Sequence, residues 1–379
     1  MNGLRLAYAI NFCRKAFLFS TYFFLPLYFL SLGFDGLQIG VLFAAYAIPS
    51  LFFTFPTGLF NDRFTVRNLL FLGLLLLLLH YLGLAFTSSF TLLCVLLFIG
   101  GMGSNISDTS ISSFVLKKVE QKKGREFSVY TSANFLGAGA GFLLGGFLLQ
   151  FLPFTSVFLL MAALYFILLF SVVLLPEAKV QRESLAEYKG DLFNRNVIVL
   201  ALVYFLFTLH WGAERIAFTP FLRENLGLDF FQSALYMAAG IIAIVPFVLW
   251  AGKKIDSSQK PRNFLFAAIL LSAIGHIAMT IPMPLVSVFF RGVHEIGDAL
   301  FDLTILLGFS RLFLNARIGG NSSAIFLIGT IGMFVGSLLF GPIAEQFGYA
   351  APLIISGVIS LAALLIALLG MKWFNEKTG

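Results

Sequence analysis

The sequence predicts an all-α polytopic membrane protein with twelve transmembrane helices in two pseudo-symmetric six-helix bundles. Three observations predict it: the composition, a series of twelve apolar runs and an internal repeat. Of the 379 residues, 59% are hydrophobic and 11% are charged, whereas soluble domains are about 25% charged. A membrane span needs roughly 20 apolar residues, so twelve spans leave no room for a sizeable soluble domain. This composition excludes a water-soluble enzyme.

Charged residues and Gly/Pro-rich stretches divide the chain into twelve apolar runs. The first six runs are 7–32, 37–60, 68–86, 90–115, 127–151 and 155–175. The second six are 197–222, 231–251, 263–281, 285–309, 322–344 and 350–373. The longest polar stretch, 176–196, is predicted to be a cytoplasmic linker between an N-terminal bundle over 1–175 and a C-terminal bundle over 197–379.

The basic residues predict the orientation of the chain in the membrane. Twelve spans place both termini on one side, and that side carries 20 of the 25 Lys and Arg residues. Because cytoplasmic loops are enriched in Lys and Arg, we expect both termini in the cytoplasm, in a prokaryotic inner membrane. The topology also explains the net charge of +7, so membrane lipid is an expected contact and nucleic acid is not.

The two halves of the chain repeat each other. At an offset of 194 residues, glycine, proline and aspartate positions of the two halves coincide. These pairs are Pro26 and Pro220, Gly33 and Gly227, Asp35 and Asp229, Gly58 and Gly252, Asp62 and Asp256, and Asp108 and Asp302. An offset of 195 then aligns Gly137, Gly141 and Gly146 with Gly332, Gly336 and Gly341. Two homologous six-helix halves follow.

The loop after the second run carries a recognisable motif. The segment 58–67 reads Gly-Leu-Phe-Asn-Asp-Arg-Phe-Thr-Val-Arg, and 252–256 reads Gly-Lys-Lys-Ile-Asp. The first segment resembles the signature of the major facilitator superfamily (MFS), although Thr65 replaces a usual glycine and only Arg67 remains of the basic cluster. The second segment resembles its echo in the other half. The resemblance implies an MFS fold with a solute site between the halves.

The resemblance also implies a cytoplasmic latch, and an Asp at a helix end facing basic residues is a physical basis for one. Its predicted residues are Gly58, Asp62, Arg63, Arg67, Gly252 and Asp256. The alternative is a plain cytoplasmic turn.

The fifth run contains glycines at 137, 139, 141, 145 and 146. Small residues allow close approach of a neighbouring helix. The run is also similar to the antiporter signature of drug exporters, but Phe142 stands at the position of its proline.

Ionisable and polar side chains gather in the first, fourth, seventh and tenth runs, which line the central cavity in the resembled family. Such groups are costly in a bilayer and mark functional sites. The predicted substrate or proton pathway consists of Arg14, Lys15, Asn105, Asp108, His210, Trp211, Glu214, Arg215, Arg291, His294, Glu295, Asp298 and Asp302. In the tenth run, Arg291, Glu295, Asp298 and Asp302 share one helical face.

Glu214 and Arg215 are expected near bilayer mid-depth. Burial and neighbouring cations act on a carboxyl group in opposite senses, so an acid held among Arg215, Arg291 and Lys15 could exchange protons as the cavity opens to either side. Glu214 or Asp298 is therefore the predicted coupling acid. The alternative is a set of static ion pairs that only hold helices together.

Other polar groups receive structural interpretations. His80 and His276 are expected to be lone histidines on apolar helices. Asn134 is expected to form an interhelical hydrogen bond. Phenylalanines such as Phe17, Phe19, Phe205, Phe218, Phe289 and Phe290 could form an apolar wall of the site. Cys13 and Cys94 have no paired spacing, and no metal site or cofactor is predicted.

The leading hypothesis is a monomeric secondary transporter that moves a small polar or charged solute by alternating access, coupled to protons. A second hypothesis is a proton-driven exporter of hydrophobic drugs, or a lipid flippase. A polytopic membrane enzyme is the third, but the sequence has no HExxH, Gly-x-Ser-x-Gly or phosphate-loop motif.

Overall fold

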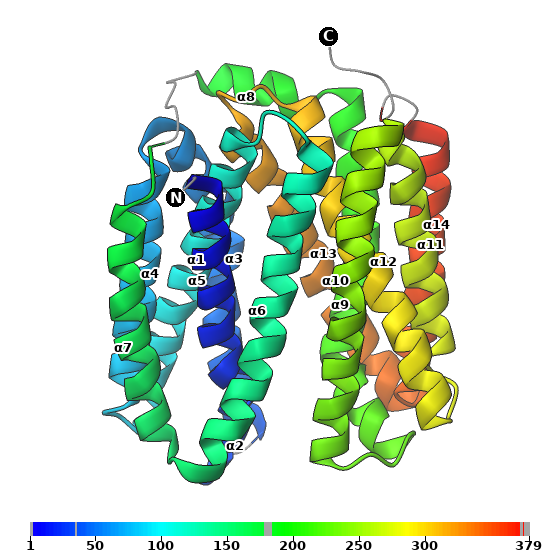
Figure 1. Cartoon of the computed structure of the whole chain (residues 1–379). Coiled ribbons are helices and arrows are strands. Elements are labelled where there is room, and N and C mark those ends of the chain that lie inside the picture. Colours follow the sequence, from blue (N-terminus) through cyan, green and yellow to red (C-terminus); the bar gives the residue numbers. More distant parts are fainter. Residues whose placement is uncertain (1–2, 35, 178–183, 372–373, 375–379) are drawn as a thin grey trace. The chain divides into compact units, whose positions relative to one another are not determined.

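The computed structural model of the chain describes residues 3–34, 36–177, 184–371 and 374, and all its regular elements in those ranges are helices. They are shown in Figure 1. The helices are α1 Gly3–Tyr22, α2 Leu25–Ser31, α3 Gly36–Arg63, α4 Val66–Leu84, α5 Phe90–Lys118, α6 Lys123–Phe151, α7 Phe154–Val173, α8 Leu185–Leu192, α9 Arg195–Glu224, α10 Phe230–Ser258, α11 Pro261–Ala278, α12 Pro284–Leu312, α13 Ile318–Phe347 and α14 Ala350–Gly370.

The predicted all-α membrane fold is confirmed. Within the described residues, ten helices are long and apolar enough to cross a membrane: α3 to α7, α9 to α11, α13 and α14. Two more, α1 and α12, have 20 and 29 residues, but every stretch of 18 residues in either helix contains three or more charged side chains. Each of the twelve predicted spans overlaps one of these twelve helices. A short helix in the linker, α8, was not predicted.

The first predicted span, 7–32, was wrong as a continuous helix, because the chain breaks at Phe23 and Phe24 into α1 and α2. Pro26 lies in the first turn of α2. Proline has no backbone N–H and its ring crowds the preceding turn, so it fits the start of a helix better than its middle. The aligned Pro220 lies inside α9, which continues through it.

The residue contacts divide the chain into two compact units. Unit 1 comprises residues 1–119, 133–183 and 315–324, and unit 2 comprises 120–132, 184–314 and 325–379. The first turns of α6 thus belong to unit 2, and those of α13 belong to unit 1.

The two units have the same internal packing. In unit 1, α4 packs on α5 and α7, and α5 also packs on α3. In unit 2, α11 packs on α12 and α14, and α12 also packs on α10. The α1–α7 contact of unit 1 corresponds to the α9–α14 contact of unit 2. Gly33 and Gly227, aligned by the repeat, both have positive φ, at 85° and 67°, a conformation that favours glycine.

The glycines of α6 allow close packing as predicted, and the aligned glycines of α13 do the same in unit 2. In α6, a Cβ atom at Gly137 or Gly141 would lie 2.5 Å from a backbone carbonyl oxygen of α1, that of Phe12 or Ala16. In α13, Gly332 and Gly336 meet the backbone of α9 in the same way, at Phe205 and Leu209. Small residues therefore set the spacing of one helix pair in each unit.

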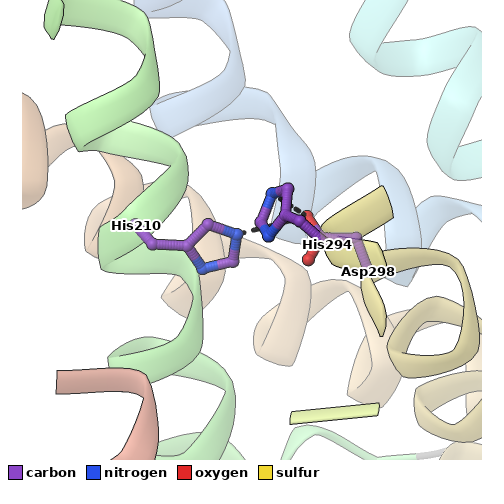
Figure 2. A group of neighbouring side chains, drawn as sticks. All are labelled: His210, His294 and Asp298. Carbon is purple, nitrogen blue, oxygen red and sulfur yellow. Dashed lines mark hydrogen bonds and ion pairs between the residues drawn. The ribbon is translucent and has the colours of Figure 1, made fainter. Parts of the chain in front are cut away.

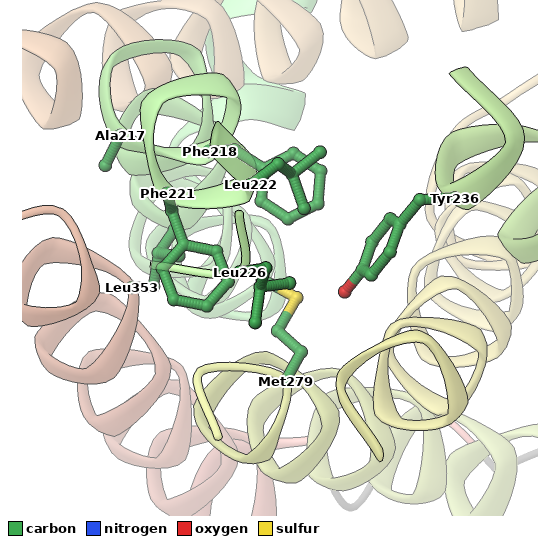
Figure 3. Close-up of a cluster of buried hydrophobic side chains, with 8 residues drawn as sticks. All are labelled: Ala217, Phe218, Phe221, Leu222, Leu226, Tyr236, Met279 and Leu353. Carbon is green, nitrogen blue, oxygen red and sulfur yellow. The ribbon is translucent and has the colours of Figure 1, made fainter. Parts of the chain in front are cut away.

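A hydrophobic cluster fills one end of unit 2 (Figure 3). It consists of Ala217, Phe218, Phe221, Leu222, Leu226, Tyr236, Met279 and Leu353. Four of these side chains come from α9, and Leu226 follows that helix. The others come from α10, from α14 and from Met279 after α11, so the cluster packs these elements against α9. The Tyr236 hydroxyl forms a hydrogen bond with Ser287 of α12, at 2.8 Å.

We expect the substitution Gly141→Ala to destabilise the protein by roughly 1–3 kcal/mol, the usual cost of overpacking. The added methyl group would lie 2.5 Å from the Ala16 carbonyl oxygen and 3.0 Å from Phe19 Cβ. Thermal unfolding of the detergent-purified protein, followed by the reactivity of its cysteines, measures the effect. The control is Gly40→Ala in α3, where the new methyl group meets nothing within 4 Å. Equal melting temperatures for the two variants would contradict this packing.

Candidate functional site

A buried polar cluster lies within unit 2, where α9, α11 and α12 meet. α9 contributes His210, Trp211 and Glu214; α11 contributes Ser272 and His276; α12 contributes Arg291, His294, Glu295 and Asp298. Close packing of α11 on α12 brings these side chains together, because Gly275 touches the backbone of His294 and Gly297 touches the backbone of Ser272. A side chain at either glycine would force the two helices apart.

Glu214 and Arg291 form the central ion pair of this cluster. Arg291 also pairs with Glu295 one turn further along α12, and its guanidinium group stacks over the Phe218 ring, 4.4 Å from the centroid. Glu214 Oε1 lies 3.1 Å from His294 Nε2 and 3.6 Å from His276 Nδ1. The Glu214 side chain keeps 18% of its surface exposed, whereas that of Arg291 keeps 5%, so the carboxylate is the more accessible member of the pair.

Asp298 lies beside the ion pair and is held by three other side chains. Its Oδ2 atom accepts a hydrogen bond from Trp211 Nε1 at 2.6 Å and lies 3.2 Å from His210 Nε2. Its Oδ1 atom accepts a hydrogen bond from Ser272 Oγ at 2.6 Å. These contacts fix the orientation of the carboxylate.

Unit 1 contains a smaller charged cluster, at the corresponding helices α1 and α5. Arg14, whose side chain is fully buried, forms an ion pair with Asp108, and Lys15 Nζ lies 2.8 Å from the same Asp108 oxygen. Arg14 also donates a hydrogen bond to Asn11, at 2.9 Å. The Asp108 side chain is 39% exposed. This carboxylate faces two cations and still has open surface around it.

Two amides tie neighbouring helices of unit 1 together. Asn11 Nδ2 donates to Asn134 Oδ1 at 2.7 Å, which confirms the predicted interhelical hydrogen bond of Asn134. Asn105 Nδ2 donates to Thr54 Oγ1 of α3, also at 2.7 Å.

The structure brings most of the predicted pathway residues into these two clusters. Of the three cations expected around Glu214, Arg291 pairs with it and Lys15 pairs with Asp108 in unit 1. Arg215 is exposed, with no ion pair or hydrogen bond to the described residues. Asp302 is half-buried, one turn beyond Asp298.

The expectation that His276 is a lone histidine was wrong. Its ring lies 4.7 Å from that of His294 and 5.1 Å from that of His210, between centroids. Ser272 and His276 were missed as members of the cluster, although their spacing of four residues on α11 places them on one face. His80 stays apart from these groups, with its Nδ1 bonded to the Leu96 carbonyl of α5 at 2.7 Å.

The predicted latch residues take part in two similar contacts. Asp62 accepts hydrogen bonds from the backbone N–H groups of Gly319 and Gly320, at 3.0 and 2.6 Å, in the first turn of α13. Asp256 accepts from those of Gly124 and Arg125, at 2.8 and 2.9 Å, in the first turn of α6. A carboxylate at a helix N-terminus satisfies unpaired N–H groups and the helix dipole.

The cation beside Asp62 is Lys117, at 2.9 Å, and both side chains are buried. Lys117 lies beyond the predicted run 90–115, because α5 continues to Lys118. Arg67 pairs with Glu177 at 2.8 Å instead. Gly58 allows the close approach of α13, since a Cβ atom at this position would overlap Ser323. Gly252 allows the close approach of α6, since a Cβ atom there would overlap Ser128.

An apolar groove lies elsewhere in unit 2, between α10, α11 and α12. Its volume is about 960 Å³. It is lined by Ala239, Phe247, Trp250, Asn263, Phe264, Ala267, Leu271, Val288, Phe289, Gly292, Val293, Ile296 and Leu300. None of these residues is charged.

Residues 7–261 match the sequence profile of the Major Facilitator Superfamily. The chain belongs to this family of multi-pass membrane transporters. Among its relatives is a multidrug resistance protein, MdtH, of Blochmanniella floridana, which is 25% identical over 323 residues covering 82% of this chain and 79% of the relative.

Solved structures show the same fold. The E. coli fucose:proton symporter FucP aligns with a TM-score of 0.80 at 15% identity, over 99% of this chain and 98% of FucP. The human organic anion transporter MFSD10 aligns with a TM-score of 0.80 at 14% identity, over 97% of this chain and 100% of MFSD10.

We expect Asp62→Asn to destabilise the protein by about 3–5 kcal/mol, because it leaves the buried Lys117 ammonium group without its counter-ion. Adding Lys117→Met to Asp62→Asn should recover part of this loss, since it removes the uncompensated charge. Thermal unfolding of the two single variants and the double variant forms a double-mutant cycle. Additive losses would mean that the two side chains do not depend on each other.

Proposed function

We propose that this protein is a secondary active transporter that moves a small polar or charged solute by alternating access and couples this movement to protons. The observation that carries the proposal is the buried cluster around Glu214 and Arg291. A membrane domain that only needed stable helix contacts could use apolar side chains, because a buried ion pair is often no more stabilising than its hydrophobic replacement. Charges of both signs in both units therefore favour a role in binding.

In this proposal Glu214 is the coupling acid, and Asp298 is the second acid of the same cluster. Glu214 is partly exposed and contacts a cation, Arg291, together with the imidazole rings of His276 and His294. Loss or gain of a proton at this group would change its attraction to Arg291, and with it the packing of α9 on α12. The relative FucP is described as a fucose:proton symporter, which agrees with coupling of this kind.

Arg14 and Lys15 are the proposed anion-binding groups of unit 1, with Asp108 as their neutralising partner. An anionic group of the solute could replace Asp108 beside these two cations, because Asp108 is partly exposed. We also propose that both termini face the cytoplasm, since 20 of the 25 basic residues then lie on that side.

Purified protein in liposomes that contain a pH-sensitive dye tests the proposal. We expect one class among sugars, amino acids, organic acids or nucleosides to drive proton movement when added outside. Glu214→Gln should reduce this proton flux to the level of empty liposomes, because the amide carries no exchangeable charge. Glu345→Gln, at an exposed position of α13, is the matched control. Unchanged coupling in both Glu214→Gln and Asp298→Asn would rule out the assigned acids.

A second candidate function is export of apolar compounds or flipping of lipids. The apolar groove between α10, α11 and α12 favours it, because it offers an uncharged binding surface. The relative MdtH is named a multidrug resistance protein.

If this second function holds, Gly292→Trp should block transport of an apolar fluorescent cation by filling the groove, while Glu214→Gln should leave that transport unchanged. A Cβ atom at Gly292 meets nothing within 4 Å, so the larger side chain can be accommodated. Flux of the dye into inverted vesicles measures both variants. Transport that depends on Glu214 and ignores Gly292 would instead favour the cluster as the site.

A further inference from the structure

Three of the four histidines of the sequence gather within unit 2, one from each of three helices. They are His210 of α9, His276 of α11 and His294 of α12, and all three are buried. The centroids of their rings lie 4.7 to 5.2 Å apart. Figure 2 shows two of these rings, His210 and His294, together with Asp298.

The hydrogen bonds of His210 and His294 determine which ring nitrogen carries the proton in the neutral state. His210 Nδ1 bonds to the Phe207 carbonyl oxygen, and His294 Nδ1 bonds to the Ser272 carbonyl oxygen at 3.0 Å. A carbonyl oxygen only accepts, so each Nδ1 is the donor. The Nε2 atom of each neutral ring is left with a lone pair.

Both lone pairs face the same carboxylate oxygen. His210 Nε2 lies 3.2 Å and His294 Nε2 lies 3.6 Å from Asp298 Oδ2. Three acceptor atoms at such distances repel one another unless a proton or a metal ion lies between them. His294 Nε2 is buried and lies 3.1 Å from Glu214 Oε1 as well, so this nitrogen faces two carboxylate oxygens.

The spacing of these three atoms fits a tetrahedral metal ion. Zinc binds histidine nitrogen and carboxylate oxygen at about 2.0–2.2 Å, which separates adjacent ligand atoms by about 3.3–3.6 Å. The two measured nitrogen-to-oxygen distances, 3.2 and 3.6 Å, are close to this spacing. All three atoms lie within 4.8 Å of one another. We propose that His210, His294 and Asp298 bind a divalent transition-metal ion of the zinc class.

The surroundings of the three ligands support this assignment. Histidines that bind metals donate their other N–H to a carbonyl or carboxylate oxygen, and metal-binding carboxylates are themselves hydrogen-bonded. Here Phe207 and Ser272 hold the two rings, and Ser272 Oγ and Trp211 Nε1 hold the two oxygens of Asp298. The site therefore has its ligands and the groups that orient them.

The charge of the cluster also matches a dication. With neutral imidazoles, the carboxylates of Glu214, Glu295 and Asp298 face a single guanidinium group, that of Arg291. The cluster then has a net charge of −2, which one divalent ion neutralises. An ion with three protein ligands keeps a fourth position for water, as zinc sites that bind exchangeable ligands do.

A neighbouring set of groups, Glu214, His276 and His294, also lies within metal-binding distance. Glu214 is already paired with Arg291, whose positive charge opposes a metal ion there. Since both sets need His294 Nε2, one ion occupies one of them, and the structure assigns it to Asp298.

Titration of the full chain in detergent with Co²⁺ and with Zn²⁺ tests the site, after chelator treatment and with a purification tag that lacks histidine. We expect one ion per chain, with the visible absorption of tetrahedral Co²⁺ that disappears when Zn²⁺ displaces it. His210→Gln and Asp298→Asn should each weaken binding by about 100-fold or more, since loss of even an orienting partner costs 10–100-fold. His80→Gln, a buried histidine of unit 1, should bind as the unchanged protein does.

X-ray absorption of the zinc-loaded unchanged protein needs no variant and keeps the proposal testable if a variant fails to fold. We expect two imidazoles per zinc at about 2.0–2.1 Å. Absence of stoichiometric binding would overturn the proposal. So would binding that survives His210→Gln but is lost in His276→Gln, because the ion would then belong to Glu214. The metal titration and the proton-flux assay of Glu214→Gln measure different quantities, so either proposal can fail while the other stands.

Discussion

A buried charged side chain in the membrane domain needs a counter-charge, and this constraint shapes both units. A carboxylate in an apolar surrounding costs several kcal/mol unless a cation or a set of donors compensates it. Glu214 meets Arg291, Asp108 meets Arg14 and Lys15, and Asp62 meets Lys117. Each of these pairs joins two different helices. The pairs therefore specify which helix faces lie together, a task that apolar packing alone performs less selectively, because many apolar faces are interchangeable.

The corresponding helices of the two units carry different sets of charged side chains. α1 and α5 of unit 1 correspond to α9 and α12 of unit 2 in their packing. Unit 1 has two cations around one acid there, whereas unit 2 has more acids than cations and adds three histidines. The two units thus share their helix contacts and differ in the charged side chains that those helices carry.

The sequence predicted the fold well because hydropathy and the internal repeat are properties of long segments. Its errors were local. The break at Phe23 and Phe24 depends on how one proline is accommodated, since Pro26 interrupts the first predicted span and Pro220 does not interrupt α9. The charged positions of α9 and α12 were found because a charge in an apolar run is conspicuous. Ser272 and His276 were not found as members of the polar cluster, because their place in it depends on the close approach of α11 to α12 at Gly275 and Gly297. His294 and Asp298, four residues apart on one helix, were a signal for a metal ligand pair, but His210 is remote in sequence.

The first turns of α6 belong to unit 2 and those of α13 belong to unit 1. This assignment bears on the order in which the chain can fold. Asp62 finds its backbone donors at Gly319 and Gly320, more than 250 positions later, and residues 315–324 belong to unit 1. Synthesis proceeds from the N-terminus, so unit 1 waits for nearly the whole chain before Asp62 is fully satisfied. Until then, this carboxylate has its ion pair with Lys117 but lacks those two donors. Asp256 has the reverse order, because its donors at Gly124 and Arg125 precede it in the chain.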